Sequence, residues 1–282
     1  MIPARSPQID CHQHFWKFSP QAFPWIGESR AVMQRDFLPP DLQPLLEDNE
    51  FDGTVAVQAL QTLEETQWLL DLSDPYPFIK AVVGWVDLRS DRVGEQLDRF
   101  TRHPKFRGVR HIVQDEADDF MGGAAFRRGI QAVGDRGLTY DLLVFPRQLQ
   151  AAINLVSRFP KQKFVLDHLA KPEIEAGNLE PWLGRIRELA QHPNVACKLS
   201  GLVTEADWGN WSRDQFTPFL TGAWEAFGPG RLLVGSDWPV CLPAASYDEV
   251  IDVVWHFLQQ YRTADREAVL GGNAVSFYGI PA

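Results

Sequence analysis

The chain has 282 residues, of which 45% are hydrophobic and 23% are charged, and its formal net charge is −10. These values exclude a disordered chain, a collagen-like chain and a coiled coil, and the negative average field disfavours a nucleic-acid partner. Three scattered cysteines predict no disulfide framework. Apolar runs are too short to span a bilayer and the N-terminus lacks a signal peptide's apolar segment, so we expect a cytoplasmic protein without a membrane partner.

Eight apolar, β-branched runs recur along the chain, and we interpret them as strands. They are Gln8–His14, Gly53–Leu60, Ile79–Leu88, Phe106–Val113, Thr139–Val144, Lys163–Leu169, Val195–Gly201 and Arg231–Trp238. Their starts lie ~24 to 45 residues apart, which leaves room for a crossover helix between consecutive parallel strands. Several runs are apolar almost throughout, as expected of parallel strands that are covered on both faces.

The segments between these runs carry helical patterns. The predicted helices are Leu63–Leu72, Asp91–Arg102, Pro146–Phe159, Pro181–Gln191, Ser212–Phe227 and Ser246–Tyr261. Thr62 and Glu65 have the spacing of a capping box. Eight such units predict an α/β fold, a single (β/α)8 TIM barrel over residues 1–282, with an open doubly wound sheet as the alternative. No G-x-G-x-x-G or Walker loop follows a strand, which argues against a nucleotide-binding open sheet.

Two connections that follow strands are longer than the others. Phe15–Phe37 is rich in aromatic residues and proline, and Leu202–Arg213 contains Trp208 and Trp211. Long loops at the carboxyl ends of barrel strands build the pockets of barrel enzymes, so we expect both loops near a site. The alternative is that their aromatic side chains only cap the barrel mouth.

Ionisable side chains end three of the predicted strands. The first ends in Asp10-Cys11-His12-Gln13-His14, and strand alternation places Asp10, His12 and His14 on one face. His168 lies at the end of the sixth run and Asp237 at the end of the eighth, after a continuous apolar stretch, where a helix N-cap is its alternative role. These strand ends meet at one mouth of a barrel. The imidazoles there can share a divalent metal ion or donate hydrogen bonds to one substrate oxygen.

Short motifs around these residues resemble the amidohydrolase superfamily. They are IDCHQHFW at 9–16, LDHLAKP at 166–172, SDWP at 236–239 and GNA at 272–274 with FYG at 277–279. They are similar to the "amidohydrolase 2" branch, which includes sugar lactonases and pyrone-dicarboxylate lactonases. The resemblance implies a hydrolase that opens a sugar lactone, such as L-fucono-, L-rhamnono- or L-galactonolactone, to its aldonic acid. The alternatives are a pyrone-dicarboxylate-type lactonase, a zinc-dependent decarboxylase of an aromatic or unsaturated acid, and a barrel that binds a small acid or sugar without turnover.

The chain departs from the superfamily's metal-rich pattern, which has a carboxylated lysine or a glutamate on the fourth strand and a histidine on the fifth. Here the fourth run ends Arg110-His111, and the fifth contains no histidine. The resemblance therefore implies at most one divalent ion, zinc first, held by His12, His14, His168 and Asp237. Lactonases of this branch can also work without a metal, so the resemblance does not require the ion for activity.

Hydrolysis of a lactone needs an activated water, a polarised carbonyl and a proton for the leaving alkoxide. We expect Asp237 to act as general base and then as acid, and His12, His14 and His168 to stabilise the oxyanion. The sequence contains no Gly-x-Ser-x-Gly motif, which disfavours a mechanism through a covalent acyl-enzyme.

Further residues are candidates for binding the substrate. They are His111, Lys171, Trp25, Gln58, Arg107 and Trp238, with Arg110 as the alternative to Arg107. Lys17, Arg30 and Arg35 would contribute only if the first long loop folds over the mouth. A pyrone dicarboxylate would need several cations, so this set favours a neutral sugar lactone as the small-molecule partner. A monomer and a homodimer both remain open.

Overall fold

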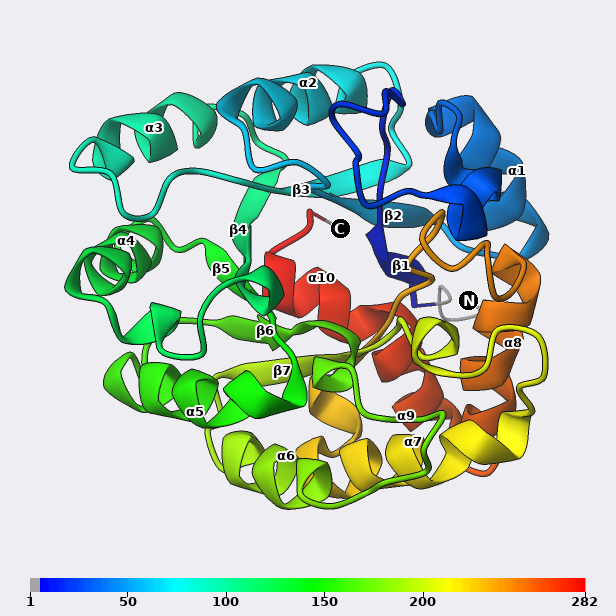
Figure 1. Cartoon of the computed structure of the whole chain (residues 1–282). Coiled ribbons are helices and arrows are strands. Elements are labelled where there is room, and N and C mark those ends of the chain that lie inside the picture. The colour runs from blue at the N-terminus through cyan, green and yellow to red at the C-terminus, as the bar shows by residue number, and fades with distance from the viewer. Residues whose placement is uncertain (1–5, 282) are drawn as a thin grey trace, which may run out of the picture.

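The computed structural model describes residues 6–281 and forms a barrel of eight parallel strands in the order β1 to β8 (Figure 1). The strands are β1 (Ile9–Gln13), β2 (Gly53–Val57), β3 (Ile79–Gly84), β4 (Phe106–Ile112), β5 (Thr139–Leu143), β6 (Phe164–Leu166), β7 (Val195–Leu199) and β8 (Leu232–Val234). A parallel bridge joins Gln13 to Trp238, and the His14 amide donates to the Trp238 carbonyl over 2.7 Å. The last strand thus returns to the first, which confirms the predicted barrel and excludes the open sheet.

Helices surround this ring of strands (Figure 1). They are α1 (Pro39–Asp48), α2 (Leu63–Ser73), α3 (Val93–Phe100), α4 (Ala124–Gly134), α5 (Leu149–Arg158), α6 (Trp182–Ala190), α7 (Arg213–Phe227), α8 (Tyr247–Leu258) and α9 (Thr263–Glu267). A further helix, α10 (Asn273–Tyr278), lies inside the ring. All six predicted helices are present, whereas α1, α4, α9 and α10 were not predicted. Thr62 caps α2 by accepting from the Glu65 amide, but the Glu65 carboxylate accepts from the Ala59 and Leu60 amides, so the capping box is not reciprocal.

The last helix, α10, closes the amino-terminal end of the barrel, and Figure 1 shows it in the middle of the ring. Its Ala274 and Tyr278 pack with Val55, Val83 and other inward-facing strand residues in an apolar cluster of the barrel interior. A second, larger cluster fills the space between the strands and the surrounding helices. Side chains therefore fill the barrel interior toward its amino-terminal end, and only the carboxyl ends of the strands leave room for a site.

The first strand contains an irregularity between Asp10 and Gln13. Cys11 belongs to the interior cluster, and the His12 side chain also points into the barrel. Asp10 instead accepts hydrogen bonds from Ser236 and from Tyr247 of α8. Our expectation that Asp10 shares a face with His12 and His14 is therefore wrong, because the irregularity breaks the alternation on which it rested.

Several strands are shorter than predicted at their carboxyl ends. β6 ends at Leu166 and β8 at Val234, before the polar residues of each motif. Those residues lie in turns at the barrel mouth, outside the ladder of hydrogen bonds. Within residues 6–281 no helix is long and apolar enough to cross a bilayer, and all three cysteines are buried free thiols.

Candidate active site

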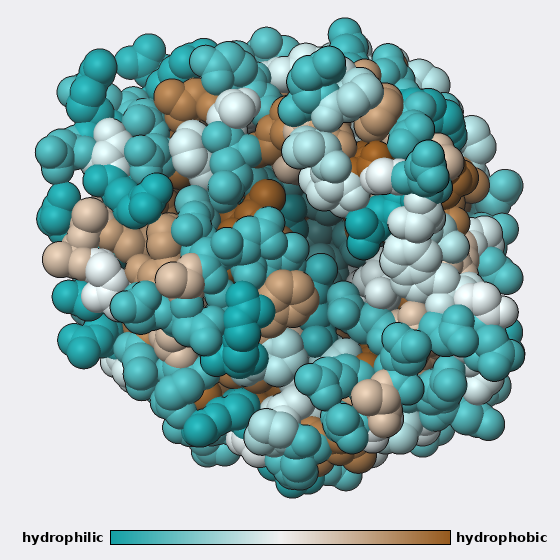
Figure 2. Space-filling model, viewed as in Figure 1, coloured by the Kyte–Doolittle hydropathy of each residue, from teal (hydrophilic) through white to brown (hydrophobic). Residues whose placement is uncertain are grey.

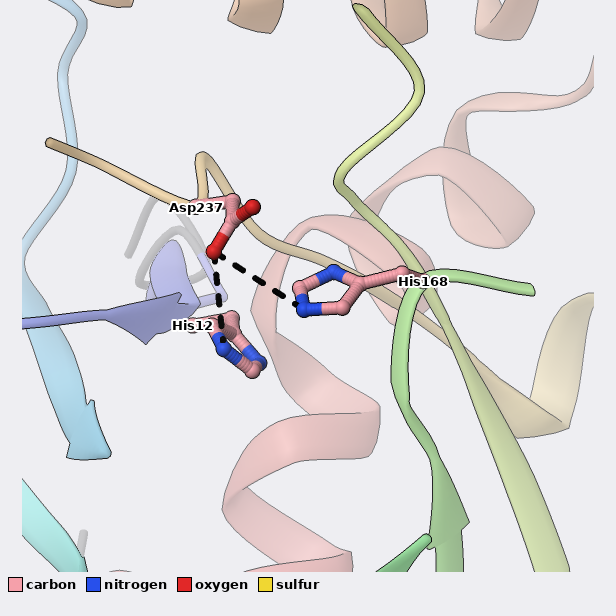
Figure 3. A group of neighbouring side chains, drawn as sticks. All are labelled: His12, His168 and Asp237. Atoms are coloured by element: carbon pink, nitrogen blue, oxygen red, sulfur yellow. Dashed lines mark ion pairs between the residues drawn. The ribbon is translucent and has the colours of Figure 1, made fainter. Parts of the chain in front are cut away.

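Three imidazoles surround one carboxylate at the mouth of the barrel. The Asp237 Oδ1 atom lies 3.4 Å from His14 Nε2, 3.7 Å from His12 Nε2 and 3.8 Å from His168 Nε2. Figure 3 shows the rings of His12, from β1, and of His168, from the turn after β6, directed toward Asp237. The structure thus brings together the four residues that the sequence separates by up to 225 positions (237 minus 12).

The turn after β6 has an unusual backbone that positions His168. The φ angles of His168, Leu169, Ala170 and Lys171 are 52°, 54°, 60° and 52°, a left-handed turn of four residues. Such angles cost L-residues roughly 1–2 kcal/mol each, so the fold concentrates strain beside the site. Gly201 packs against this turn, because a Cβ there would lie 2.6 Å from His168 Nδ1.

A buried ionic network lies beneath His12. The fully buried Lys198 ammonium contacts Asp141 Oδ2 at 2.7 Å, Asp167 Oδ1 at 2.9 Å and His12 Nδ1 at 3.1 Å. His12 Nδ1 also lies 3.4 Å from Asp167 Oδ1. The nitrogen can therefore accept from the ammonium or donate to the carboxylate, which lets Nε2 face the mouth as a donor or with a free lone pair.

The hydrogen bonds of the other two imidazoles leave their Nε2 atoms directed at Asp237. His14 Nδ1 lies 2.9 Å from the Val57 carbonyl and must donate to it. His168 Nδ1 pairs with the Ser200 hydroxyl at 2.9 Å. Each ring is thus held in place by a hydrogen bond of its Nδ1 atom, on the ring edge that faces away from Asp237.

The electrostatics favour an ionised Asp237 beside neutral imidazoles of His12 and His168. Burial opposes ionisation of Asp237, but His168, the hydrogen bond from His14 and His12 together hold its pKa below the usual range. Burial lowers the pKa of His168 to about 4, and burial together with the Lys198 charge lowers the pKa of His12 well below its usual value. At neutral pH the site therefore contains one anionic base beside the neutral imidazoles of His12 and His168.

This donor set fits a single divalent metal ion. Ligand atoms of His12, His168 and Asp237 all lie within 4.8 Å of one another, and the three side chains are buried. Ligands at about 2.1 Å from a tetrahedral zinc would be separated by about 3.4 Å, close to the spacing between Asp237 and the imidazoles. Neutral imidazole and ionised carboxylate are also the protonation states that metal binding requires.

A cavity of about 460 Å³ opens above this group. His14, His168 and Asp237 lie in its wall together with Arg110, which comes from β4. Figure 2 shows a hollow near the middle of this face, with mostly hydrophilic residues around it. The wall also includes aromatic and cationic side chains from the loops after β1, β6 and β7, namely Trp16, Trp25, Arg30, Lys171 and Trp208. The long loop 15–37 therefore does contribute to the mouth.

Two of the six predicted substrate-binding residues, Trp25 and Lys171, line this cavity. Gln58 lies behind its wall, fully buried, where its side-chain oxygen accepts from the Arg110 guanidinium. Trp238 is also buried and packs edge-on against Phe15 and Phe37 beneath the loop.

His111 and Arg107 lie outside the cavity. His111 stacks on Phe120 with ring centroids 4.9 Å apart and pairs with Glu116, on the helix side of β4. Arg110 points inward, and because neighbouring strand residues face opposite ways His111 must point outward. Arg107 lies near the amino end of β4, away from the mouth. As a candidate for binding the substrate, the structure thus favours Arg110, the alternative to Arg107, over both His111 and Arg107.

Other residues of the site were not predicted. Glu205 lines the cavity 3.6 Å from Lys171, and burial raises the pKa of its carboxyl. Asp141 and Lys198 lie within otherwise apolar strands, and a charged residue in such a run is the signal that could have identified them as a buried pair. Glu205 carries no comparable signal, because acidic residues are common in loops.

The barrel, with this donor set at the carboxyl ends of its strands, places the protein in the class of (β/α)8-barrel enzymes. Residues 9–280 match the family model described as Amidohydrolase. The chain belongs to the amidohydrolase family, as its motifs indicated.

Similar proteins cover nearly the whole chain. It is 43% identical to an L-fucono-1,5-lactonase of Burkholderia multivorans, over 97% of this chain and 96% of that protein. It is 40% identical to an L-fucono-1,5-lactonase of Burkholderia ambifaria, with the same coverage of both chains. A crystal structure of an amidohydrolase from Burkholderia multivorans with bound zinc superposes with a TM-score of 0.95, at 43% identity over 98% of this chain and 100% of that one.

Proposed function

We propose that the protein is a hydrolase that opens a sugar lactone to the corresponding aldonic acid, with L-fucono-1,5-lactone as the first substrate to test. The observation that carries the proposal is the ionised Asp237 among three imidazoles, at the floor of a cavity of about 460 Å³. The identity of 43% with an L-fucono-1,5-lactonase over almost the full length supports the same activity.

Asp237 is the general base in this proposal. Its carboxylate is ionised at neutral pH, so it can take a proton from water as the oxygen attacks the lactone carbonyl. The same carboxyl can then deliver that proton to the ring oxygen as the C–O bond breaks. No covalent intermediate is needed, because water is the nucleophile.

The imidazoles stabilise the negative charge that develops on the carbonyl oxygen. When Lys198 donates to its Nδ1, His12 carries its proton on Nε2 and can donate toward the mouth. Arg110 Nη1, 3.2 Å from this nitrogen, then donates to Asp167 instead. When bound, a zinc ion at His12, His168 and Asp237, with His14 beside it, would polarise the carbonyl as a Lewis acid. We infer that the ion assists and is dispensable, because the side chains already provide a base and a donor.

The charges of the cavity support a neutral substrate over a dicarboxylate. Arg110 is already engaged by Gln58 and by Asp167. Lys171 is close to Glu205. Among residues 6–281, Arg30 at the rim is then the one cation of the wall without an ion pair, so two carboxylates would lack a second free cation. Hydroxyl groups, by contrast, can bind both the donors and the acceptors of the wall.

The decisive experiment measures acid release from a panel of L- and D-aldonolactones, with and without a chelator. We expect turnover of L-fucono-1,5-lactone that persists, at a reduced or equal rate, after chelation. Binding without acid release would contradict the proposal. Complete loss of acid release on chelation would contradict the inference that the ion is dispensable. No acid release from any lactone, even with zinc added, would favour a reaction such as decarboxylation, to be tested next on aromatic acids.

We further propose that residues 1–282 act as one domain on this small molecule, without a nucleic-acid partner. The net charge of −10 supports the proposal that the protein has no nucleic-acid partner. The cytoplasmic location and the choice between monomer and homodimer stay predictions. Size-exclusion chromatography with light scattering would decide the oligomeric state.

A further inference from the structure

Two loops from different parts of the chain meet at the rim of the cavity. Trp25 and Arg30 lie in loop 15–37 after β1, and Trp208 lies in the loop after β7. All three side chains line the same cavity as Asp237. The rim is thus formed by side chains that play no part in the proposed chemistry.

The Arg30 guanidinium links the two loops. Its carbon lies 5.7 Å from the centroid of the Trp25 ring and 5.4 Å from that of Trp208, both within cation–π range. One Nη1 hydrogen donates to the Trp25 carbonyl over 3.0 Å. These contacts fix the position of the charged group at the entrance.

Most donors of this guanidinium have no partner among residues 6–281. Among residues 6–281, Arg30 forms no ion pair with a carboxylate, and its side chain makes only the one hydrogen bond to Trp25. A guanidinium has five N–H donors, and contact with a ring face leaves those in its plane free. A half-buried arginine with several free donors in a cavity wall is well suited to bind ligand oxygens.

We propose that Arg30 is a specificity-determining residue that donates hydrogen bonds to hydroxyl oxygens of the lactone, with Trp25 and Trp208 holding its guanidinium in place. This inference rests on the proposed function and specifies the substrate as a polyhydroxylated lactone. Arg30 lies at the rim and the imidazoles lie at the floor. Its hydroxyl partners are therefore remote from the reacting carbonyl, and the interaction is equally strong in the ground state and the transition state.

The test compares Arg30→Ala with the wild type on L-fucono-1,5-lactone and on δ-valerolactone, a six-membered lactone without hydroxyl groups. Loss of uniform binding raises KM without changing kcat, so we expect KM for the sugar lactone to rise about tenfold or more, with kcat within about twofold. Turnover of δ-valerolactone should be unaffected. Arg30→Lys keeps the charge but not the planar fork, and should recover only part of the loss.

Arg35→Ala is the matched control. Arg35 lies in the same loop and over an aromatic ring, 3.9 Å from the Phe37 centroid, but it does not line the cavity. Its replacement should leave KM for both lactones unchanged. An unchanged KM for the sugar lactone in Arg30→Ala overturns the inference, as does a lowered kcat or an equal loss on both lactones. A wild type that hydrolyses neither lactone would instead refute the proposed function.

The role of the tryptophans is tested by a double-mutant cycle on the sugar lactone. If Trp208 acts by holding Arg30, the double variant Arg30→Ala/Trp208→Ala should be no more impaired than the worse of the two single variants. Fully additive effects would show that Trp208 contacts the substrate independently, and would overturn this part of the inference.

Discussion

At the residue scale, Asp237 has the central position in the site. Its Oδ1 atom lies within 3.8 Å of three imidazole nitrogens, and its own amide donates to the His12 carbonyl over 2.8 Å. The backbone contact fixes the residue between β8 and β1, while the side chain is free to reach the cavity. Replacing the carboxylate therefore changes the chemistry without removing the backbone contact.

We expect Asp237→Asn to lower kcat by about 10²–10⁴, because a carboxamide cannot take a proton from water. The variant should keep its fold, since an amide of the same shape fills the same space. Initial rates of acid release and far-UV circular dichroism check the two parts. Near-normal turnover would remove Asp237 from the role of base.

His168 gives a pH dependence of stability. Its pKa in the folded protein is about 4, below the 6.5 of an exposed histidine, so between these values the unfolded chain binds a proton that the folded protein does not. Its contribution to stability is complete above pH 6.5, falls as the pH drops and levels off below about pH 4. The loss amounts to about 3 kcal/mol.

Urea unfolding at intervals between pH 7 and pH 4.5 measures this effect. His168→Asn should show a smaller loss of stability over this range than the wild type. His256→Asn, at an exposed position of α8, should behave like the wild type. Identical pH profiles for all three proteins would refute the assignment to His168.

At the element scale, one turn and one helix position the side chains of the site. The left-handed turn at 168–171 directs His168 and Lys171 to the same cavity. At the other end, α10 supports the ionic network from below, because the Tyr278 hydroxyl donates to Asp141 Oδ2 over 2.7 Å. Asp141 in turn contacts Lys198, which contacts His12. The last helix is thereby connected to the first strand of the site.

Tyr278→Phe should destabilise the protein by about 1–3 kcal/mol, because it removes one donor from a buried carboxylate and leaves the ring packing intact. Chemical denaturation measures the change. Ser276→Ala, at an exposed position of the same helix, is the control and should have little effect. A Tyr278→Phe variant as stable as the wild type would mean that Lys198 and Thr139 satisfy Asp141 without the tyrosine hydroxyl.

At the scale of the whole molecule, closure of the barrel creates the site. The bridge between Gln13 and Trp238 joins the ends of the sheet, and it brings His12 and His14 beside Asp237. A ligand that contacts β1 and the turns after β6 and β8 at the same time can therefore bind only the folded barrel. Such a ligand must raise the stability of the whole fold.

Added zinc should thus raise the midpoint of thermal unfolding, by an amount equivalent to about 2.7 kcal/mol when its concentration is a hundred times its dissociation constant. Differential scanning fluorimetry with increasing zinc measures the shift. His168→Ala should abolish most of it. An equal shift in that variant would show that zinc binds elsewhere on the protein.

The sequence by itself determined the barrel and four members of the site. Apolar runs at regular intervals encode parallel strands, and His12, His14, His168 and Asp237 each follow such a run, so barrel closure was enough to predict their meeting. Trp25 and Lys171 were predicted to lie at the site because they, too, are close to the motifs at the strand ends. Local patterns carry this information because strand burial and strand direction are local properties.

Only the tertiary structure decided which way individual side chains point and which loops meet. The irregularity in β1 turned Asp10 outward, the inward direction of Arg110 placed His111 outside, and Arg30 reached Trp208 across the mouth. A one-residue change of register reverses every following side chain, and it depends on the neighbouring strands. Loop contacts likewise depend on residues that are distant in the chain, which no local pattern records.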